Sequence, residues 1–189
     1  LGKLDLTDNA SNFITDQAGA DNNGRNLRAT LSLNRLQKLT DKTNILLKFN
    51  SQFAADNLDG GEQCTLGGLN GVRAYTSSEA AGDAGFTTGI EIKRNFFNLP
   101  TTIFYDYGKI RVHKNKWTGW ISTHTELKNT YALKGWGLTM DVPFFNFFNM
   151  QLTHSRTIQG NSGKDSEGFD VDGLSWDDRT IVSLSKQYK

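Results

Sequence analysis

Apolar and polar residues alternate one by one through several separate segments of this chain, and this period of two constrains the fold more than any other feature. In residues 86–93, for example, Phe86, Ile90 and Ile92 share one face, whereas Glu91 lies on the other. Such alternation is typical of β-strands that have one apolar and one polar face. Eight strands are therefore expected, at residues 1–6, 27–34, 45–53, 86–93, 103–108, 135–142, 148–152 and 182–188.

The composition excludes several classes of protein but leaves the kind of β-protein open. Only 37% of the 189 residues are hydrophobic, the mean hydropathy is −0.51, and no run approaches the roughly 18 apolar residues of a transmembrane helix. A formal net charge of +1 argues against a dedicated nucleic-acid binder, and a single cysteine excludes an internal disulfide framework. A transmembrane β-barrel also looks hydrophilic on average, so a soluble β-protein, a barrel and a largely disordered chain all remain possible.

The connections between the expected strands alternate in length. Long polar segments cover 8–26, 56–85, 113–129 and 157–178, and short ones lie at 37–43, 95–101 and 143–148. Outer-membrane barrels have this asymmetry, with long loops at one end and tight turns at the other. The short turns are also rich in aromatic residues, which is typical of a lipid–water boundary: Phe96, Phe97, Phe144, Phe145, Phe147 and Phe148.

The polar face of the strands supports a barrel with a hydrated lumen. It is too charged for a packed interior, because it carries Lys48, Asn50, Gln52, Glu91, Lys93, Asp106 and Asp141. A soluble β-sandwich would bury the apolar face instead, and alternation alone does not distinguish the two arrangements. A helix is conceivable only over residues 31–47, where Asn, Thr and β-branched residues favour a strand.

Two motifs carry a more specific signal. The longest loop is rich in glycine and has a compact tip around Val72, Arg73 and Tyr75. One strand and one turn later comes the segment 104–108, Phe-Tyr-Asp-Tyr-Gly, in which alternation places Asp106 on the polar face. These motifs resemble the long sixth loop and a wall strand of the two-partner secretion transporters, the haemolysin secretion/activation (TpsB-type) family of POTRA-containing outer-membrane barrels. The loop motif matches at Gly67, Gly68, Val72, Arg73, Tyr75, Glu79, Ala80, Gly82 and Asp83, with Ala74 as a variant position within it, and the wall motif matches at Phe104, Asp106 and Gly108.

The resemblance implies an all-β transmembrane antiparallel barrel, of which residues 1–189 form the C-terminal half, strands 9 to 16 of 16. It implies that the loop at about 56–85 folds into the lumen, where Arg73 meets Asp106. The sequence departs from the family pattern in two places: Ala74 replaces a commoner glycine, and Cys64 replaces a small hydroxyl residue. The chain starts as if inside a strand and ends on Lys189 after Tyr188, so we expect sequence upstream and a shortened end.

The function implied by the resemblance is export of an unfolded partner protein, of haemolysin or adhesin type, across the bacterial outer membrane. The expected partners are that secreted protein, the lipid bilayer and lipopolysaccharide, and the chain's own upstream POTRA domains and N-terminal barrel half, with no nucleic acid. No enzyme activity and no cofactor are expected. No nucleophile elbow is present, the three histidines lack ligand spacing, and the acidic segment 165–178 is interpreted as a solvated loop rather than a calcium site.

Three alternatives remain at this stage. An assembly factor of the same superfamily shares the loop motif but inserts other barrels. A self-contained eight-stranded barrel would act as an adhesin or a structural protein. A soluble β-sandwich would be a binding module.

Overall fold

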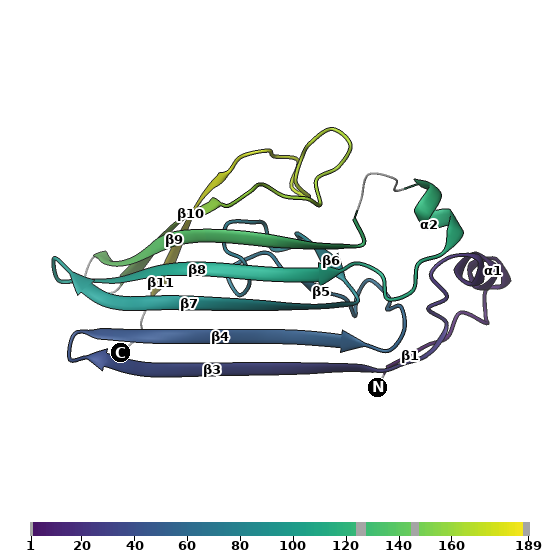
Figure 1. Cartoon of the computed structure of the whole chain (residues 1–189), viewed down its shortest axis with the longest axis horizontal. Helices are drawn as coiled ribbons and strands as arrows, with labels where there is room; N and C mark the ends of the chain where they lie inside the picture. The colour runs from purple at the N-terminus through teal and green to yellow at the C-terminus, as the bar shows by residue number, and fades with distance from the viewer. Residues whose placement is uncertain (1, 124–127, 145–147, 187–189) are drawn as a thin grey trace.

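The computed structural model describes residues 2–123, 128–144 and 148–186, and its main feature is one antiparallel sheet of seven strands (Figure 1). These strands are β3 (Arg28–Thr40), β4 (Thr43–Ala54), β7 (Ala84–Phe96), β8 (Leu99–Arg111), β9 (Thr130–Phe144), β10 (Phe148–Thr157) and β11 (Asp178–Lys186). Each pairs with its neighbours along the chain, in the order β11-β10-β9-β8-β7-β4-β3. The alternating segments from residue 27 onward therefore all form strands of one sheet, including the two across residues 31–47.

The strand expected at residues 1–6 does not join this sheet, and the expectation of eight strands in the wall is corrected to seven. Residues Gly2–Leu4 form β1, which pairs with β2 (Gly24–Asn26) in a separate two-stranded sheet. The chain turns immediately after β1, where the Asp5 carboxylate accepts hydrogen bonds from both the backbone and the hydroxyl of Thr7. Three residues of alternation are too short to specify a place in the wall, so local turn chemistry decides their partner.

Two short helices lie in segments that the sequence indicated only as polar loops. Helix α1 (Ala10–Ala18) follows Asn9, whose side-chain oxygen accepts a hydrogen bond from the Asn12 N–H and so caps the first turn. Helix α2 (Thr118–Thr123) lies in the connection between β8 and β9. Neither has the length and apolar character needed to cross a membrane.

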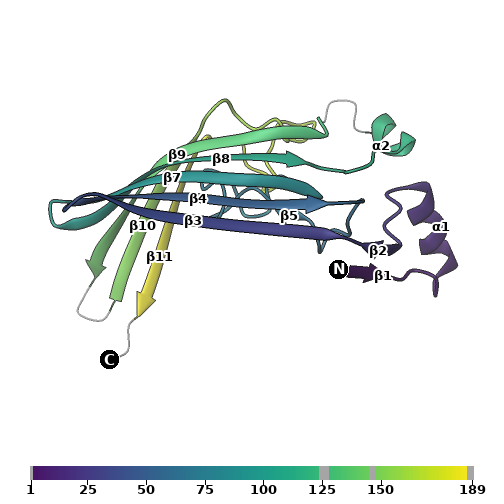
Figure 2. The same cartoon turned by 60° about the horizontal axis from the view of Figure 1, so that its bottom comes forward.

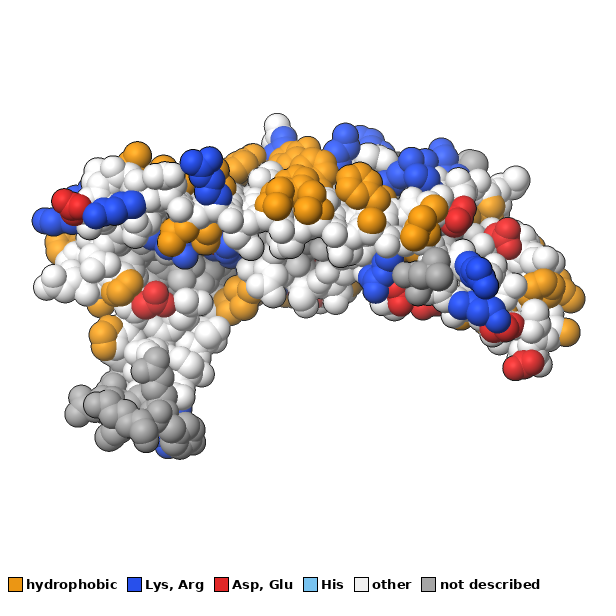
Figure 3. All heavy atoms as spheres, turned by 90° about the horizontal axis from the view of Figure 1, so that it is seen from below, with side chains coloured by type: hydrophobic (Ala, Val, Ile, Leu, Met, Phe, Trp, Pro, Cys, Tyr) orange, Lys and Arg blue, Asp and Glu red, His pale blue; other side chains and the backbone are white. Residues whose placement is uncertain are grey.

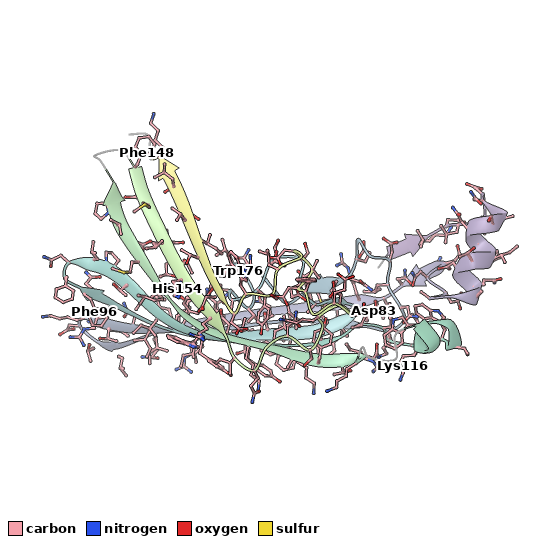
Figure 4. The ribbon with its side chains drawn as sticks, turned by 90° about the horizontal axis from the view of Figure 1, so that it is seen from above. Asp83, Phe96, Lys116, Phe148, His154 and Trp176 are labelled. Atoms are coloured by element: carbon pink, nitrogen blue, oxygen red, sulfur yellow. The ribbon has the colours of Figure 1, made fainter. Side chains whose placement is uncertain are left out.

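Long and short connections alternate as expected, so the two ends of the sheet differ. In Figure 4, Phe96 and Phe148 lie at the end with the short turns, whereas Asp83 and Lys116 lie toward the end with the long loops. The turn between β3 and β4 takes only residues 41–42, and that between β7 and β8 only 97–98. Of the aromatic residues expected at the turns, Phe145 and Phe147 lie outside the described residues, as does Tyr188.

The sheet curves strongly, because β10 and β11 swing away from the plane of β3 to β8 (Figure 2). Its outward face is apolar and open, with Leu33 56% exposed and Trp136 51% exposed. Figure 3 shows one view in which hydrophobic side chains gather over the middle of the molecule and basic ones lie toward both sides of them. The concave face is polar and is covered by the long loop, with β5 (Cys64–Thr65) and β6 (Ala81–Gly82).

This arrangement differs from two of the alternatives. A β-sandwich needs a second sheet packed face to face, but the small β1-β2 and β5-β6 pairs are the other sheets of the described residues. A closed eight-stranded barrel needs its first and last strands to pair, but β3 and β11 lie at opposite edges of the sheet. The described part is therefore an open, curved wall of a barrel.

Candidate functional site

The site lies where the loop between β4 and β7 packs against the concave face of the wall. Its core is a cluster of buried apolar side chains from both partners. The loop contributes Leu66, Val72, Ala74, Tyr75 and Ala80, and the wall contributes Ile110 and Leu133. Because each of these side chains is at most 3% exposed, the loop is a packed part of the structure and not a solvated surface segment.

The glycine pair of the loop motif allows the chain to double back tightly. A Cβ on Gly67 would lie 1.9 Å from the Thr76 carbonyl oxygen, so no side chain fits there. Gly68 has φ of +94°, a backbone conformation that residues with a side chain rarely adopt. The resulting turn is closed by the Val72 N–H, which donates a 2.7 Å hydrogen bond to the Leu66 carbonyl oxygen.

Glycines of the wall make room for the loop tip. A Cβ on Gly108 would lie 3.1 Å from Val72, and one on Gly135 would lie 2.5 Å from the Cβ of Ala74. Gly108 belongs to the wall motif, whereas Gly135 is a residue that the sequence analysis did not assign to the site. Its signal was present in the sequence, since alternation places Gly135 on the polar face of its strand.

Arg73 is the centre of the contact between loop and wall. Its Nε and Nη2 atoms donate hydrogen bonds of 2.8 Å to Oδ2 and Oδ1 of Asp106, and its backbone N–H donates a third, of 3.1 Å, to Oδ2. The guanidinium carbon lies 3.5 Å from the centroid of the Phe104 ring, in cation–π geometry. A planar guanidinium suits this combination of bidentate pairing and stacking better than a lysine would.

A second carboxylate, Glu91, completes the site and was missed by the sequence analysis as a site residue. Its Oε1 lies 2.9 Å from Nη1 of Arg73 and 2.6 Å from Nζ of Lys48, and its Oε2 lies 3.2 Å from Nζ of Lys93. Glu91 is directly opposite Phe104 in the β7–β8 register. The alternation indicated that Glu91 lies on the polar face of its strand, but only this register puts Glu91 beside Arg73.

Opposite charges therefore lie next to one another throughout the site, with one more positive than negative. Arg73, Lys48 and Lys93 supply three positive charges around the two carboxylates of Glu91 and Asp106. The side chains of Arg73, Glu91 and Asp106 are at most 9% exposed. Removing one member of such a buried set leaves an uncompensated charge in a region of low polarity, which costs several kcal/mol.

The backbone of the loop tip is also bound to the far side of the wall. The hydroxyl of Ser155, on β10, donates a 3.1 Å hydrogen bond to the Arg73 carbonyl oxygen. Ser155 is fully buried and lies opposite Gly137 in the register. Arg73 therefore connects β7, β8 and β10, three strands of the wall, through one residue.

The remaining acidic residues of the loop motif bind groups at the loop end of the sheet, both within the long loop and in neighbouring loops. Glu79 accepts hydrogen bonds from the Asn161 side chain, at 2.8 Å, and from the Val171 N–H, at 3.0 Å, both in the connection between β10 and β11. Asp83 accepts from the backbone N–H groups of Leu58, at 3.1 Å, and Lys114, at 2.7 Å. These two carboxylates connect the long loop to its neighbours at the loop end of the sheet.

Three further residues of the motif take structural positions. The hydroxyl of Tyr75 donates a 3.0 Å hydrogen bond to the Gly160 carbonyl oxygen, and burial raises the pKa of this phenol to about 12. Gly82 lies so close to β8 that a Cβ would be 2.6 Å from the Arg111 carbonyl oxygen. Cys64 is half-buried opposite Gly82, and burial raises the pKa of its thiol, which favours the unreactive protonated form.

The site has the character of a mechanical contact between loop and wall. Across residues 2–123, 128–144 and 148–186, no three His, Cys, Asp or Glu side chains lie together in a way that would hold a metal ion. The charged groups at the loop tip are occupied by one another. What the arrangement can do is hold or release a large loop on the inner face of a curved β-wall.

A strongly curved antiparallel wall with an apolar outer face, a charged inner face and an inserted loop defines a transmembrane β-barrel protein. The model of the haemolysin secretion/activation protein family ShlB/FhaC/HecB matches residues 7–138, and the chain belongs to this family of two-partner secretion transporters, which are located in the outer membrane of Gram-negative bacteria.

A comparison with solved structures adds information on the fold. The chain is similar to CdiB from Acinetobacter baumannii, with a TM-score of 0.51 and 20% sequence identity, over 85% of this chain and 26% of that one. At this identity the likeness concerns the fold, and the chain spans about a quarter of the length of that protein. No curated protein sequence matches the chain significantly.

Proposed function

We propose that this chain is the C-terminal half of a 16-stranded outer-membrane pore, with POTRA domains upstream, that exports an unfolded partner protein of haemolysin or adhesin type. Membership of the two-partner secretion family supports this proposal. The charged inner face of the wall supports it as well, because a hydrated lumen lets a polar, extended chain pass without a cofactor. In this proposal the chain is not an enzyme, and its partners are the secreted protein, the bilayer with its lipopolysaccharide, and its own upstream domains.

The observation that carries the proposal is the contact between Arg73 and Asp106. The loop lies on the concave face, which is the inside of the pore in any closed barrel built from this wall. A chain in transit needs that space, so the loop must either move or share the lumen with it. We infer that the Arg73–Asp106 contact sets the position of the loop and thereby the secretion-competent state of the pore.

Charge reversal tests this proposal in the intact transporter. Arg73→Asp and Asp106→Arg each place two like charges at the contact, and we expect secretion of the partner to fall at least tenfold in each. The double variant restores opposite charges and should recover part of the activity. Lys116→Asp is the matched control, because Lys116 is exposed at the loop end and reverses the same charge away from the contact.

The measurement is the amount of partner protein released from cells, divided by the amount of folded barrel in the outer membrane. Wild-type secretion in both single variants would refute the role of the contact. A loss of other outer-membrane barrels, with secretion unchanged, would instead identify an assembly factor of the same superfamily.

A further inference from the structure

The outward face of the wall carries a pattern of charge that the proposed function does not use. Among the described strand positions on this face, the basic residues fall into two groups and Asp178 is the one acidic residue. Toward the loop ends of the strands lie Lys109, Arg111, Lys134 and Arg156, and toward the turn ends lie Arg35, Arg94 and Lys186, called here the turn-end bases. Because the chain as a whole has a net charge of only +1, this excess is local to one surface.

Three of the loop-end bases form a regular series across adjacent strands. Lys109, on β8, lies opposite Ala132, and Lys134 comes two residues further along β9, toward the turn end. The series is called here the basic stair and consists of Lys109, Lys134 and Arg156. Strands in a transmembrane barrel are tilted by roughly 35–45°. A step of this kind from strand to strand largely offsets the tilt, so the three charges lie at similar heights along the barrel axis.

Each base of the stair also lies directly opposite an aromatic residue of the preceding strand. The pairs in the register are Phe86 with Lys109, Tyr107 with Lys134, and Trp136 with Arg156. The same combination thus recurs three times in the register, a basic residue paired with an aromatic residue on the neighbouring strand. The turn-end bases also lie near aromatic rings, because Lys186 is opposite Phe148 and lies 5.8 Å from its ring, and Arg94 lies 5.6 Å from the ring of Phe96. The basic stair differs from them in its place at the loop ends of the strands and in its regular step from strand to strand.

The charges of the stair are only lightly engaged within the chain. Lys134 donates one hydrogen bond, of 2.7 Å, to the Gln159 side chain, and Nε of Arg156 lies 3.8 Å from Oδ1 of Asp178. Lys109 is exposed and makes no ion pair with any residue of the described chain. Arg111 differs and is not part of the stair, because its guanidinium donates to the carbonyl oxygens of His113 and Lys114.

We propose that the basic stair is a binding site for the phosphate groups of lipid A in the outer leaflet. This ligand has phosphates on a sugar headgroup directly above several acyl chains, which matches a row of cations directly above aromatic and aliphatic side chains. Neighbouring bases on adjacent strands are diagonal neighbours, roughly 7–8 Å apart at their backbones, so two can reach one phosphorylated headgroup. The proposal relies on the location of the family in the outer membrane and is independent of what the pore exports.

The experiment uses the intact transporter, purified in detergent micelles and titrated with hexa-acylated bisphosphoryl lipid A. Bound lipid is counted by native mass spectrometry. In the triple variant Lys109→Gln, Lys134→Gln, Arg156→Gln we expect lipid A to bind roughly 100-fold more weakly, since each basic residue at an anionic membrane surface contributes about a fivefold factor. The matched control replaces the three turn-end bases with Gln, which removes the same charge, and should bind within about threefold of wild type.

Several outcomes would overturn the proposal. Equal binding by the wild type and the stair variant would do so, as would an equal loss in the turn-end control. Displacement of lipid A by excess inorganic phosphate would identify a free-anion site, and equal retention of phosphatidylglycerol would identify a general anionic surface. Folding of each variant is checked by its heat-dependent gel mobility. If the triple variant does not fold, Lys109→Gln alone should bind about fivefold more weakly, and unchanged binding by this variant overturns the proposal.

Discussion

The fit between Gly135 and the loop tip gives the sharpest test of how the loop is held. A Cβ at position 135 would lie 2.5 Å from the Cβ of Ala74, whereas two such carbons normally approach no closer than about 3.5–4.0 Å. Gly135→Ala must therefore move the tip or the wall by about 1 Å. The hydrogen bonds from Arg73 to Asp106, at 2.8 Å, would lengthen toward the distance of about 3.5 Å at which they cease to count as bonds.

The expected cost in the free energy of loop docking depends on how the site responds. It either stays in place and is overpacked or moves and loses hydrogen bonds, so the two costs are not added. Overpacking a filled site costs about 1–3 kcal/mol, and loss of charge-assisted hydrogen bonds costs about 1.5–3 kcal/mol. We therefore expect Gly135→Ala to weaken loop docking by about 2–3 kcal/mol. Because about 1.4 kcal/mol corresponds to a factor of ten, the undocked population should rise about 30- to 150-fold.

The chain offers its own reporter for this population. Cys64 is the single cysteine, lies in the loop, and is half-buried where β5 pairs with β6. The assay is the rate of maleimide labelling of Cys64 in the folded protein. This rate follows the open population when reclosing is faster than labelling. It should therefore rise in Gly135→Ala by about the factor given above.

A compensating variant distinguishes a steric clash at the loop tip from general damage to the wall. Ala74→Gly removes the atom with which the new Cβ collides, and the contact next in distance is the Arg156 carbonyl oxygen at 3.2 Å. In the double variant Gly135→Ala, Ala74→Gly, labelling should return to within about tenfold of wild type, allowing for the added freedom of glycine. If the single variant labels at the wild-type rate, or if the second substitution restores nothing, the tip is not held by this fit.

Three further predictions use the same protein. Glu91→Gln should raise the labelling rate less than Asp106→Asn, because Asp106 accepts three hydrogen bonds from the arginine and Glu91 makes one contact with it; the opposite order would contradict this geometry. Burial raises the pKa of the Cys64 thiol, so its labelling rate should continue to increase as the pH rises past the ordinary thiol pKa of about 8.5. A pH–rate profile that levels off at about pH 8.5 would contradict the raised pKa. The hydrogen bond from Arg179 lowers the pKa of Asp172. The stability that this hydrogen bond contributes is therefore fully present when the pH is above the unfolded pKa of about 3.9, and it is lost as the pH falls through the lower pKa of the folded protein. Proteolysis of the β10–β11 loop should accelerate only below about pH 4, and Asp172→Asn should abolish that acceleration.

Much of the wall was predictable because its signal is local. The segments with Phe86, Ile90 and Ile92, and with Phe104 and Asp106, form strands with the expected faces. A strand sends successive side chains to opposite faces, so the sequence of one segment reveals its two surfaces without knowledge of its neighbours. The first strand forms at Gly2–Leu4, but it pairs with β2 outside the wall, because so short a segment holds too little pattern to choose a partner.

The site was predictable only in part. The motifs indicated Arg73 and Asp106, and alternation put the aspartate on the inner face. Neither indicated Glu91 as a partner of the arginine, nor Ser155 and Gly135 as contacts of the tip. These residues come from three different strands, and their closeness depends on how those strands are aligned.

By itself, the sequence determined that this chain forms β-strands with one apolar and one charged face, joined alternately by turns and long loops. Those properties follow from the period of two and from residues adjacent along the chain. Only the tertiary structure decided that Glu91, Phe104 and Gly137 share one row, and that the loop tip fits against that part of the wall. A shift of one residue in any pairing would send those side chains to the opposite face, so the site is a consequence of strand register, which no single segment contains.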